Sequence, residues 1–179
     1  MAGVEWIKLE LDVASFESDG LQTDVERVTT SGIVLTSLED LGNTTDNRYR
    51  MYKLNAECSA DIPGRGEFHS WDEYQRARLE AVSFDPSGVI LAIDGDQWIG
   101  MSALSHREAV EYGFAEMTGT VRSHRKRGIA IAMKVSGIAY AKELNLSTIR
   151  TVHHPGNDAM IGLNRRLGFV DATWDYPSR

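Results

Sequence analysis

The fold is decided by residues 111–144, which read EYGFAEMTGTVRSHRKRGIAIAMKVSGIAYAKEL. Residues 111–121 have the composition of a strand, and residues 128–144 predict a helix that is apolar on most sides, as expected of a helix packed against a sheet. A cationic turn marked by Gly128 joins them. The first N–H groups of a helix have no partner within the helix, and the helix dipole favours negative charge. A strand, a basic turn and a helix in this order therefore predict a site for a phosphate group.

The bulk composition indicates an acidic globular chain of one domain. The 179 residues are 42% hydrophobic and 25% charged, which is ordinary for a folded domain. The net charge of −7 argues against a nucleic-acid partner, which would need a basic surface. Against this acidic background, the cations between Arg122 and Arg127 indicate a local site for a compact anionic ligand.

The same composition bears on location and on metals. No apolar run approaches the roughly 20 residues of a membrane span, and the segment MAGVEWIKLELDV lacks the cationic and apolar regions of a signal peptide. Cys58 is the only cysteine, which excludes an internal disulfide and a thiolate zinc cluster. We therefore expect a cytoplasmic protein with no membrane partner and no metal site.

The order of the expected elements indicates a mixed α+β fold, because three strands in succession exclude a purely alternating pattern of strands and helices. We expect strands at residues 32–38, 89–94, 97–104, 111–121, 147–155 and 169–176, and helices at 46–60, 70–82, 128–144 and 157–167. An extra strand at residues 4–13 precedes them, followed by a polar segment that forms a loop or a short helix. The chain is expected to be one globular unit, with residues 1–30 as the extra strand and its connection and residues 31–179 as the main domain.

Local signals support these boundaries. Thr44 or Thr45 can cap the first helix, and Ser70 with Glu73 has the spacing of a capping box. Asn157 stands where the N-cap of the last helix belongs.

Two elements are expected to have distinct buried and polar sides. In the extra strand, the residues expected on the buried side are Val4, Trp6, Leu9 and Leu11. In the helix of residues 128–144, the polar side of the helix is expected to carry Lys134, Lys142 and Glu143.

Two motifs in this order resemble those of the GCN5-related N-acetyltransferases, the GNAT superfamily. The first is (Arg or Gln)-x-x-Gly-x-(Gly or Ala), which here reads Arg125-Lys-Arg-Gly128-Ile-Ala130. The second is a helix block that reads Asn157-Asp-Ala-Met-Ile-Gly-Leu-Asn164-Arg-Arg-Leu-Gly168-Phe169. The resemblance covers residues 31–176, and the block TGTVRSHRKRGIA together with Asn164 is further similar to modules of mycothiol-synthase-like tandem GNAT proteins.

The resemblance implies the GNAT acyl-CoA N-acyltransferase fold. This fold has a mostly antiparallel, twisted sheet that is flanked by helices and splayed between its fourth and fifth strands. Counted without the extra N-terminal strand, these are residues 111–121 and 147–155 here.

The resemblance also implies acetyl-CoA as the cosubstrate. The residues implied in its binding are Thr118, Gly119, Thr120, Arg125, Lys126, Arg127, Gly128, Ile129, Ala130, Ile131 and Asn157. Amides from Lys126 to Ile131 would hold the pyrophosphate, and the end of the fourth strand would bind the pantetheine arm through its backbone. Two alternatives stay open: the cations form a solvated turn, and Asn157 acts only as a helix cap.

The resemblance leaves the catalytic acid open. Family members often use a tyrosine of the last helix to protonate the departing thiolate, and that position here is Asn164. An amide cannot act as an acid at neutral pH, so Asn164 would donate a hydrogen bond to the sulfur or only pack. Tyr140 and Tyr176 could replace the missing acid.

The catalytic base has two candidates. Glu116 on the fourth strand is the first, although the commonest catalytic glutamate of the family would fall on Phe114. One of His153 and His154, at the end of the fifth strand, is the second, with His153 preferred. Either side chain could instead be an ordinary structural residue.

These observations predict an acetyl-CoA-dependent N-acetyltransferase that moves an acetyl group to a primary amine by direct attack in a ternary complex. Cys58 has no catalytic partner nearby in the sequence, which disfavours a covalent enzyme intermediate. The alternative is a non-catalytic acyl-CoA-binding or regulatory module that retained the turn and lost the chemistry. The acceptor is an unidentified small-molecule or peptide amine. The extra strand could extend the sheet or contact a partner, so a homodimer is also open.

Overall fold

The structure is a computed structural model that describes residues 4–107 and 109–175. Its sheet is made of seven strands: β1 (Ile7–Asp12), β2 (Val34–Ser37), β3 (Val89–Asp94), β4 (Gln97–His106), β5 (Tyr112–Thr120), β6 (Thr148–His153) and β7 (Val170–Asp171). The α-helices are α1 (Gln22–Thr30), α2 (Leu38–Leu41), α3 (Thr45–Ser59), α4 (Trp71–Tyr74), α5 (Ile129–Glu143) and α6 (Asp158–Arg166). Short 3-10 turns lie at Asp19–Leu21, Pro86–Gly88 and Arg122–His124, and a one-turn π-helix at Gln75–Leu79 continues α4.

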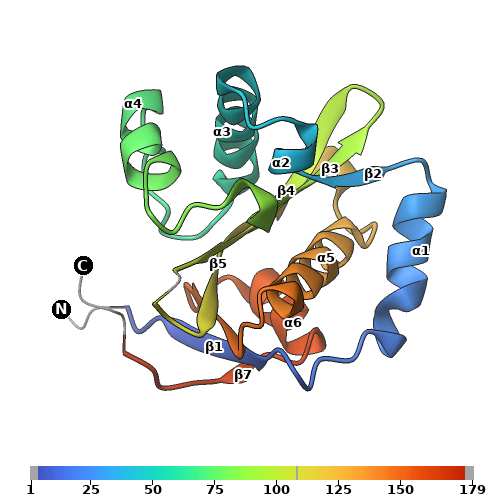
Figure 1. Cartoon of the computed structure of the whole chain (residues 1–179), viewed down its shortest axis with the longest axis vertical. Coiled ribbons are helices and arrows are strands. Elements are labelled where there is room, and N and C mark those ends of the chain that lie inside the picture. Colours follow the sequence, from blue (N-terminus) through green and yellow to red (C-terminus); the bar gives the residue numbers. More distant parts are fainter. Residues whose placement is uncertain (1–3, 108, 176–179) are drawn as a thin grey trace.

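The seven strands form one sheet in the order β2-β3-β4-β5-β6-β1-β7 (Figure 1). Every neighbouring pair is antiparallel except β5 and β6, which run parallel. The parallel pair is joined by α5, as a crossover connection requires. The predicted mixed fold with a mostly antiparallel sheet is therefore confirmed.

The helices cover both faces of the sheet. In Figure 1, α3 and α4 lie on one side, and α5 lies on the other with α1 and α6 beside it. Two glycines allow this close packing: a Cβ on Gly119 would lie 2.6 Å from Cβ of Cys58 in α3, and one on Gly100 would lie 2.9 Å from Cε of Met133 in α5. No helix in the described part of the chain is long and apolar enough to cross a membrane.

Several local predictions are confirmed at atomic detail. The Thr44 hydroxyl accepts from the N–H of Asn47 at the start of α3, and Ser70 with Glu73 forms the reciprocal capping box of α4. The hairpin between β3 and β4 turns at Gly95, whose φ of +57° is in the left-handed region that glycine tolerates. The second helix ends earlier than predicted, because the chain passes into the π-helix and leaves Val82 93% exposed.

The N-terminal strand β1 is an interior strand of the sheet, next to the edge strand β7. β1 pairs with β6 on one side and with β7 on the other, and an ion pair of 2.7 Å joins Glu10 of β1 to Arg150 of β6. Leu9 and Leu11 are buried as predicted, whereas the prediction for Val4 and Trp6 is wrong, because both precede β1 and are about half exposed. The polar segment after β1 contains α1.

The sheet opens between β5 and β6. These strands pair only where Tyr112–Phe114 lies beside Thr148–Arg150. Beyond that point, β5 continues to Thr120 and β6 to His153 without pairing with each other. At the point of separation, the Thr151 hydroxyl donates to the carbonyl oxygen of Ala115 over 3.1 Å. The predicted splay between these two strands is therefore confirmed.

The position of β1 leads to a prediction about stability. Leu9 has no exposed surface, and Leu9→Ala should lower the free energy of unfolding by about 3 kcal/mol through lost burial and a new cavity. Urea denaturation followed by circular dichroism measures this. Val170→Thr, at a position that is 64% exposed on β7, should change stability by less than about 1 kcal/mol. Equal effects of the two substitutions would contradict the buried position of β1.

Candidate active site

A cavity of about 460 Å³ occupies the opening between β5 and β6. Its lining comes from both layers of the fold: α3, α4 and its π-helix on one side, α5 and α6 on the other, and β4, β5 and β6 between them. Of the residues predicted from the sequence, it includes Glu116, Thr118, His153 and Asn157. The cavity therefore brings together one predicted base candidate from each of the two diverging strands.

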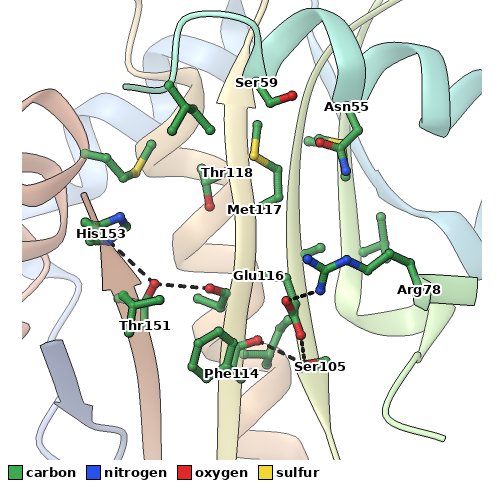
Figure 2. Close-up of a pocket in the computed structure, with 18 of the residues that line it drawn as sticks. Asn55, Ser59, Arg78, Ser105, Phe114, Glu116, Met117, Thr118, Thr151 and His153 are labelled. Carbon is green, nitrogen blue, oxygen red and sulfur yellow. Dashed lines mark hydrogen bonds and ion pairs between the residues drawn. The ribbon is translucent and has the colours of Figure 1, made fainter. Parts of the chain in front are cut away.

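Glu116 stands on a β-bulge. Across from β4, Ala103 pairs with Met117 and Leu104 pairs with Ala115, so that Glu116 has no partner residue in the register. A bulge leaves the extra residue unpaired and bends the strand, which is a common way to aim a functional side chain. The Glu116 side chain lines the cavity and points toward Ser105 of β4 and Arg78 of the π-helix that follows α4 (Figure 2).

Both oxygens of the Glu116 carboxylate have partners. Oε1 accepts from the Ser105 hydroxyl over 2.8 Å, and Oε2 accepts from Nη1 of Arg78 over 2.6 Å (Figure 2). The Arg78 side chain is 47% exposed and comes from the π-helix, so it can leave without disturbing the core. A cationic amine entering the cavity can therefore take the place of the arginine beside the carboxylate.

His153, which is half-buried and lines the cavity, pairs with the buried Asn164. Nδ2 of Asn164 lies 2.6 Å from Nε2 of His153, and Asn164 has no exposed surface. Its Oδ1 atom has no hydrogen-bond partner in the described part of the chain. Burial, together with the nearby charge of Lys134, lowers the pKa of His153 from 6.5 to about 4, so this imidazole is neutral and only weakly basic at neutral pH.

Lys134 was missed as a site residue by sequence reasoning, which placed it on the polar side of α5. It is only 6% exposed, lines the cavity, and has its Nζ atom 5.2 Å from the centre of the Phe169 ring. Burial lowers the pKa of its ammonium from 10.5 to about 8. Helical spacing could have revealed this position, because Ile131 and Ile138, one turn before and one turn after it, are both buried.

The basic turn lies at the end of β5, outside the lining of the cavity. Gly128 has a φ of +83° and Lys126 a φ of +61°, so the backbone bends sharply before α5 begins. The first N–H to bond within α5 is that of Ala132, which donates to the carbonyl of Gly128. In the described residues, the amides from Lys126 to Ile131 have no acceptor, and no side chain caps the helix.

The arginines and lysine of the turn have different partners. Arg122 and Arg125 both donate to the carboxylate of Asp61, whose pKa these two hydrogen bonds hold well below its usual range. Arg125 also donates to the carbonyl of Thr120 over 3.0 Å, which ties the turn to the end of β5. Lys126 and Arg127 are exposed and make no ion pair with the described residues.

The remaining predicted cofactor residues lie on or near the open edge of β5. Thr118 shares a hydrogen bond of 3.0 Å with Ser102, Gly119 gives room to α3, and Thr120 is buried with its hydroxyl unpaired in the described part of the chain. Asn157 stands at the N-cap position of α6 as predicted, but its side chain forms no capping hydrogen bond and instead lines the cavity.

Tyr140, one of the two tyrosines considered as the acid, is not among the residues that line the cavity. The Tyr140 hydroxyl donates to Asp85, and burial with this carboxylate raises the pKa of Tyr140 to about 12. Tyr176 lies outside the described residues. In residues 4–107 and 109–175, no group of three or more His, Cys, Asp or Glu side chains is arranged to hold a metal ion.

Comparison with known proteins identifies the family. Residues 43–170 match the family model described as Acetyltransferase (GNAT) domain. The chain belongs to the GNAT family. This GNAT chain is 28% identical over 128 residues to a mycothiol acetyltransferase of Pseudarthrobacter chlorophenolicus, covering 68% of the chain and 38% of that relative. It is 29% identical over 136 residues to a mycothiol acetyltransferase of Renibacterium salmoninarum, covering 70% of the chain and 39% of that relative.

A solved structure shows the same fold. The GCN5-related N-acetyltransferase from Sphaerobacter thermophilus superimposes with a TM-score of 0.63 at 17% identity, covering 93% of this GNAT chain and 48% of that protein. The chain thus spans less than half the length of these relatives and of this neighbour. The comparisons therefore show the domain family and its architecture.

The low pKa of His153 predicts a pH dependence of stability. As pH falls, the unfolded state takes up a proton at this position near pH 6.5 and the folded state only near 4, so stability from neutral His153 is lost between these values. The stability difference between the wild type and His153→Gln should narrow by up to roughly 3 kcal/mol over that range. Urea denaturation from pH 7 to pH 4 measures it. Parallel curves for the two proteins would contradict the buried, neutral state of the histidine.

Proposed function

We propose that this GNAT chain binds acetyl-CoA and transfers the acetyl group to a primary amine by direct attack in a ternary complex. The observation that carries the proposal is the opening between β5 and β6, with a carboxylate on a bulge inside it and a turn of unbonded amides at its end. A thioester in the opening and an amine entering from the α4 side would meet beside Glu116.

The turn before α5 has the chemistry that a pyrophosphate requires. Its backbone amides point to no protein acceptor in the described residues, and the positive end of the α5 dipole lies there. Lys126 and Arg127 are exposed cations that can bind phosphate oxygens. Arg122 and Arg125, held by Asp61, instead fix the shape of the turn.

The open edge of β5 suits the pantetheine arm. Beyond Phe114, β5 has no strand beside it on its β6 side, so backbone groups up to Thr120 can bond the amides of an extended ligand, as in strand addition. The Thr151 hydroxyl donates a hydrogen bond to the carbonyl of Ala115, so this carbonyl is not free to bind such a ligand. Asn157, whose side chain lines the cavity, would contact the arm from α6.

The proposed reaction uses Glu116 as the base. The amine enters as an ammonium group, replaces Arg78 beside the carboxylate, and loses a proton to it directly or through one water. The free amine then attacks the thioester carbon, and collapse of the tetrahedral species breaks the carbon–sulfur bond. His153 and Asn164 are proposed to shape the site from behind, because the low pKa of the imidazole makes it a weak base.

A covalent cysteine route is disfavoured by the same structure. Cys58 is buried in α3 against Gly119, and burial raises the pKa of its thiol to about 12. A thiol of this kind is almost entirely protonated at neutral pH and is therefore a poor nucleophile.

The proposed acceptor is a small-molecule or peptide amine. The cavity of about 460 Å³ can hold a small amine or the first residue of a peptide. The relatives named mycothiol acetyltransferase are longer than this chain, and the name supports an acetyl acceptor of modest size without defining which one.

A second candidate function is a non-catalytic acyl-CoA-binding module. Two observations favour it: Glu116 is paired with Arg78, and the position of the family's acidic tyrosine is held by the buried amide of Asn164. Isothermal titration with acetyl-CoA and thiol-release assays over a panel of amines distinguish the two. Turnover of any amine supports the enzyme, and binding without turnover supports the module.

Gly128→Glu should abolish acetyl-CoA binding. The substitution puts negative charge at the phosphate turn, and a Cβ there would lie 3.4 Å from Oδ1 of Asp24. We expect the affinity measured by titration calorimetry to fall at least about 100-fold, which corresponds to ~2.7 kcal/mol. Gly128→Gln, with the same size and the same left-handed backbone, should lose at least about 10-fold less. Wild-type affinity in a folded Gly128→Glu protein would refute the assignment of the turn.

Glu116→Gln should separate binding from catalysis. Without the carboxylate, the amine keeps its proton, so kcat should fall by about 10²–10³-fold while acetyl-CoA affinity is retained. Steady-state thiol release with a substrate amine, combined with calorimetry, tests both parts. Glu57→Gln, an exposed substitution on α3, serves as the control and should leave kcat unchanged. A kcat within threefold of the wild type in Glu116→Gln would remove Glu116 as the base.

A further inference from the structure

The cavity contains a buried ammonium group that the proposed reaction has not yet used. Lys134 extends from the second turn of α5 and lines the opening together with Thr118 of β5 and His153 of β6. In the described part of the chain its Nζ atom makes no ion pair and no hydrogen bond, and the Phe169 ring lies 5.2 Å from it. A buried cation without an anion indicates that the anion comes from a ligand.

A purely structural role explains Lys134 poorly. Burying an ammonium without a partner is unfavourable, and a methionine of similar length would fill the same space without that cost. The loss of hydration is the physical cause of the low pKa of Lys134, near 8. The ring of Phe169 at 5.2 Å compensates for part of the lost hydration, but it does not neutralise the charge.

The groups around Lys134 leave it as the strongest acid in this part of the cavity. The titratable group that faces it is His153 of β6, which is neutral. From α6 comes the amide of Asn164, which is engaged with His153, and from β5 the hydroxyl of Thr118, which is engaged with Ser102. On the opposite wall, burial raises the pKa of Tyr74 further above 10.

We propose that Lys134 is the general acid that protonates the coenzyme A sulfur as it leaves. The inference rests on the proposed acetyl transfer. When the tetrahedral species collapses, the carbon–sulfur bond breaks and its electron pair goes to sulfur. The proton on Nζ moves to that sulfur, giving the thiol and a neutral lysine. The nitrogen of the attacking amine loses its second proton to solvent as the amide forms, and Glu116 releases the first. One solvent proton recharges the lysine, so that one proton is released net per turnover.

The acidities of the two partners are well matched. A free thiol has a pKa near 8.5, and the ammonium of Lys134 has one of about 8. Proton transfer between groups of such similar pKa is nearly balanced in free energy, which is favourable for general acid catalysis near neutral pH. An exposed lysine, with its pKa above 10, would hold the proton too tightly.

Lys134→Met is the decisive variant. We expect kcat to fall by about 100-fold, with the dissociation constant of acetyl-CoA changed less than about threefold. The wild-type kcat should decline as pH rises through about 8, because Lys134 must be protonated, and this decline should be absent in the variant. The melting temperature should rise by roughly 5 °C below pH 8, because a buried charge is removed. That gain should shrink toward pH 10.5, where the wild-type lysine loses its charge in the unfolded state as well.

Two control variants sharpen the test. Lys142→Met makes the same change on the same helix at an exposed position, where Nζ donates to the carbonyl of Phe16, and it should leave kcat and its pH profile intact. Tyr74→Phe removes a tyrosine hydroxyl that lines the cavity and could act as an acid in place of Lys134. This substitution should also leave the alkaline decline of kcat in place. A Lys134→Met protein with kcat within threefold of the wild type and the same decline would overturn the inference. A lower melting temperature together with unchanged kinetics would assign Lys134 a structural role.

A direct measurement on the complex with coenzyme A separates this inference from the proposed function. The ultraviolet absorbance of the thiolate gives the pKa of the bound thiol without any acceptor amine. In the wild type the ammonium should lower this pKa below 8.5, and in Lys134→Met the shift should disappear. Equal thiol pKa values in the two proteins would overturn the role of Lys134 while leaving acetyl transfer standing. Failure of the wild type to bind coenzyme A would overturn both.

Discussion

The separation of β5 from β6 is the constraint on which the rest of the site depends. These two parallel strands pair only where Tyr112–Phe114 lies beside Thr148–Arg150, and then separate. A parted pair leaves backbone donors and acceptors without partners, which is unfavourable unless water or a ligand meets them. Thr151 supplies one bond at the fork, and the rest of the edge stays open. The bulge at Glu116 lies on the same strand, so the unpaired backbone of β5 and the Glu116 carboxylate border one cavity.

The predictable part of this molecule is the part that is local in sequence. Thr44 and Ser70 cap helices because their hydroxyls reach amides only a few residues away, and the GNAT motif around Gly128 could be recognised from a short spacing. The position of β1 could not be predicted, because strand pairing across the whole chain decides it. The pairing of Arg78 with Glu116, from segments far apart in the sequence, was inaccessible for the same reason. Lys134 is the intermediate case, since its helical spacing pointed inward although its charge suggested the surface.

The charges of the turn show how an acidic chain can hold an anion. With a net charge of −7, the long-range field of the protein repels phosphate, so attraction has to be local. Asp61 takes up Arg122 and Arg125, which removes two cations from the field but fixes the loop after α3 against the end of β5. Fixed amides then face outward without having to reorganise, with Lys126 and Arg127 beside them. The geometry of the turn, more than the number of its cations, is what suits a pyrophosphate.

Glu116 and Lys134, two titratable groups that line the cavity, differ in how far they are exposed to water. Glu116 is partly exposed and is hydrogen-bonded to the exposed Arg78 side chain and to Ser105. Lys134 is almost completely buried, and desolvation makes its ammonium easier to deprotonate. Beside it, the amide of Asn164 is hydrogen-bonded to His153. A positive charge on His153 and one on Lys134 would each destabilise the other. The imidazole therefore gives up its charge first, because its intrinsic pKa is lower, and the proton stays on Lys134. In this arrangement an amide at the tyrosine position is compatible with acid catalysis, because it holds the neighbouring histidine in place while the proposed acid, Lys134, comes from α5.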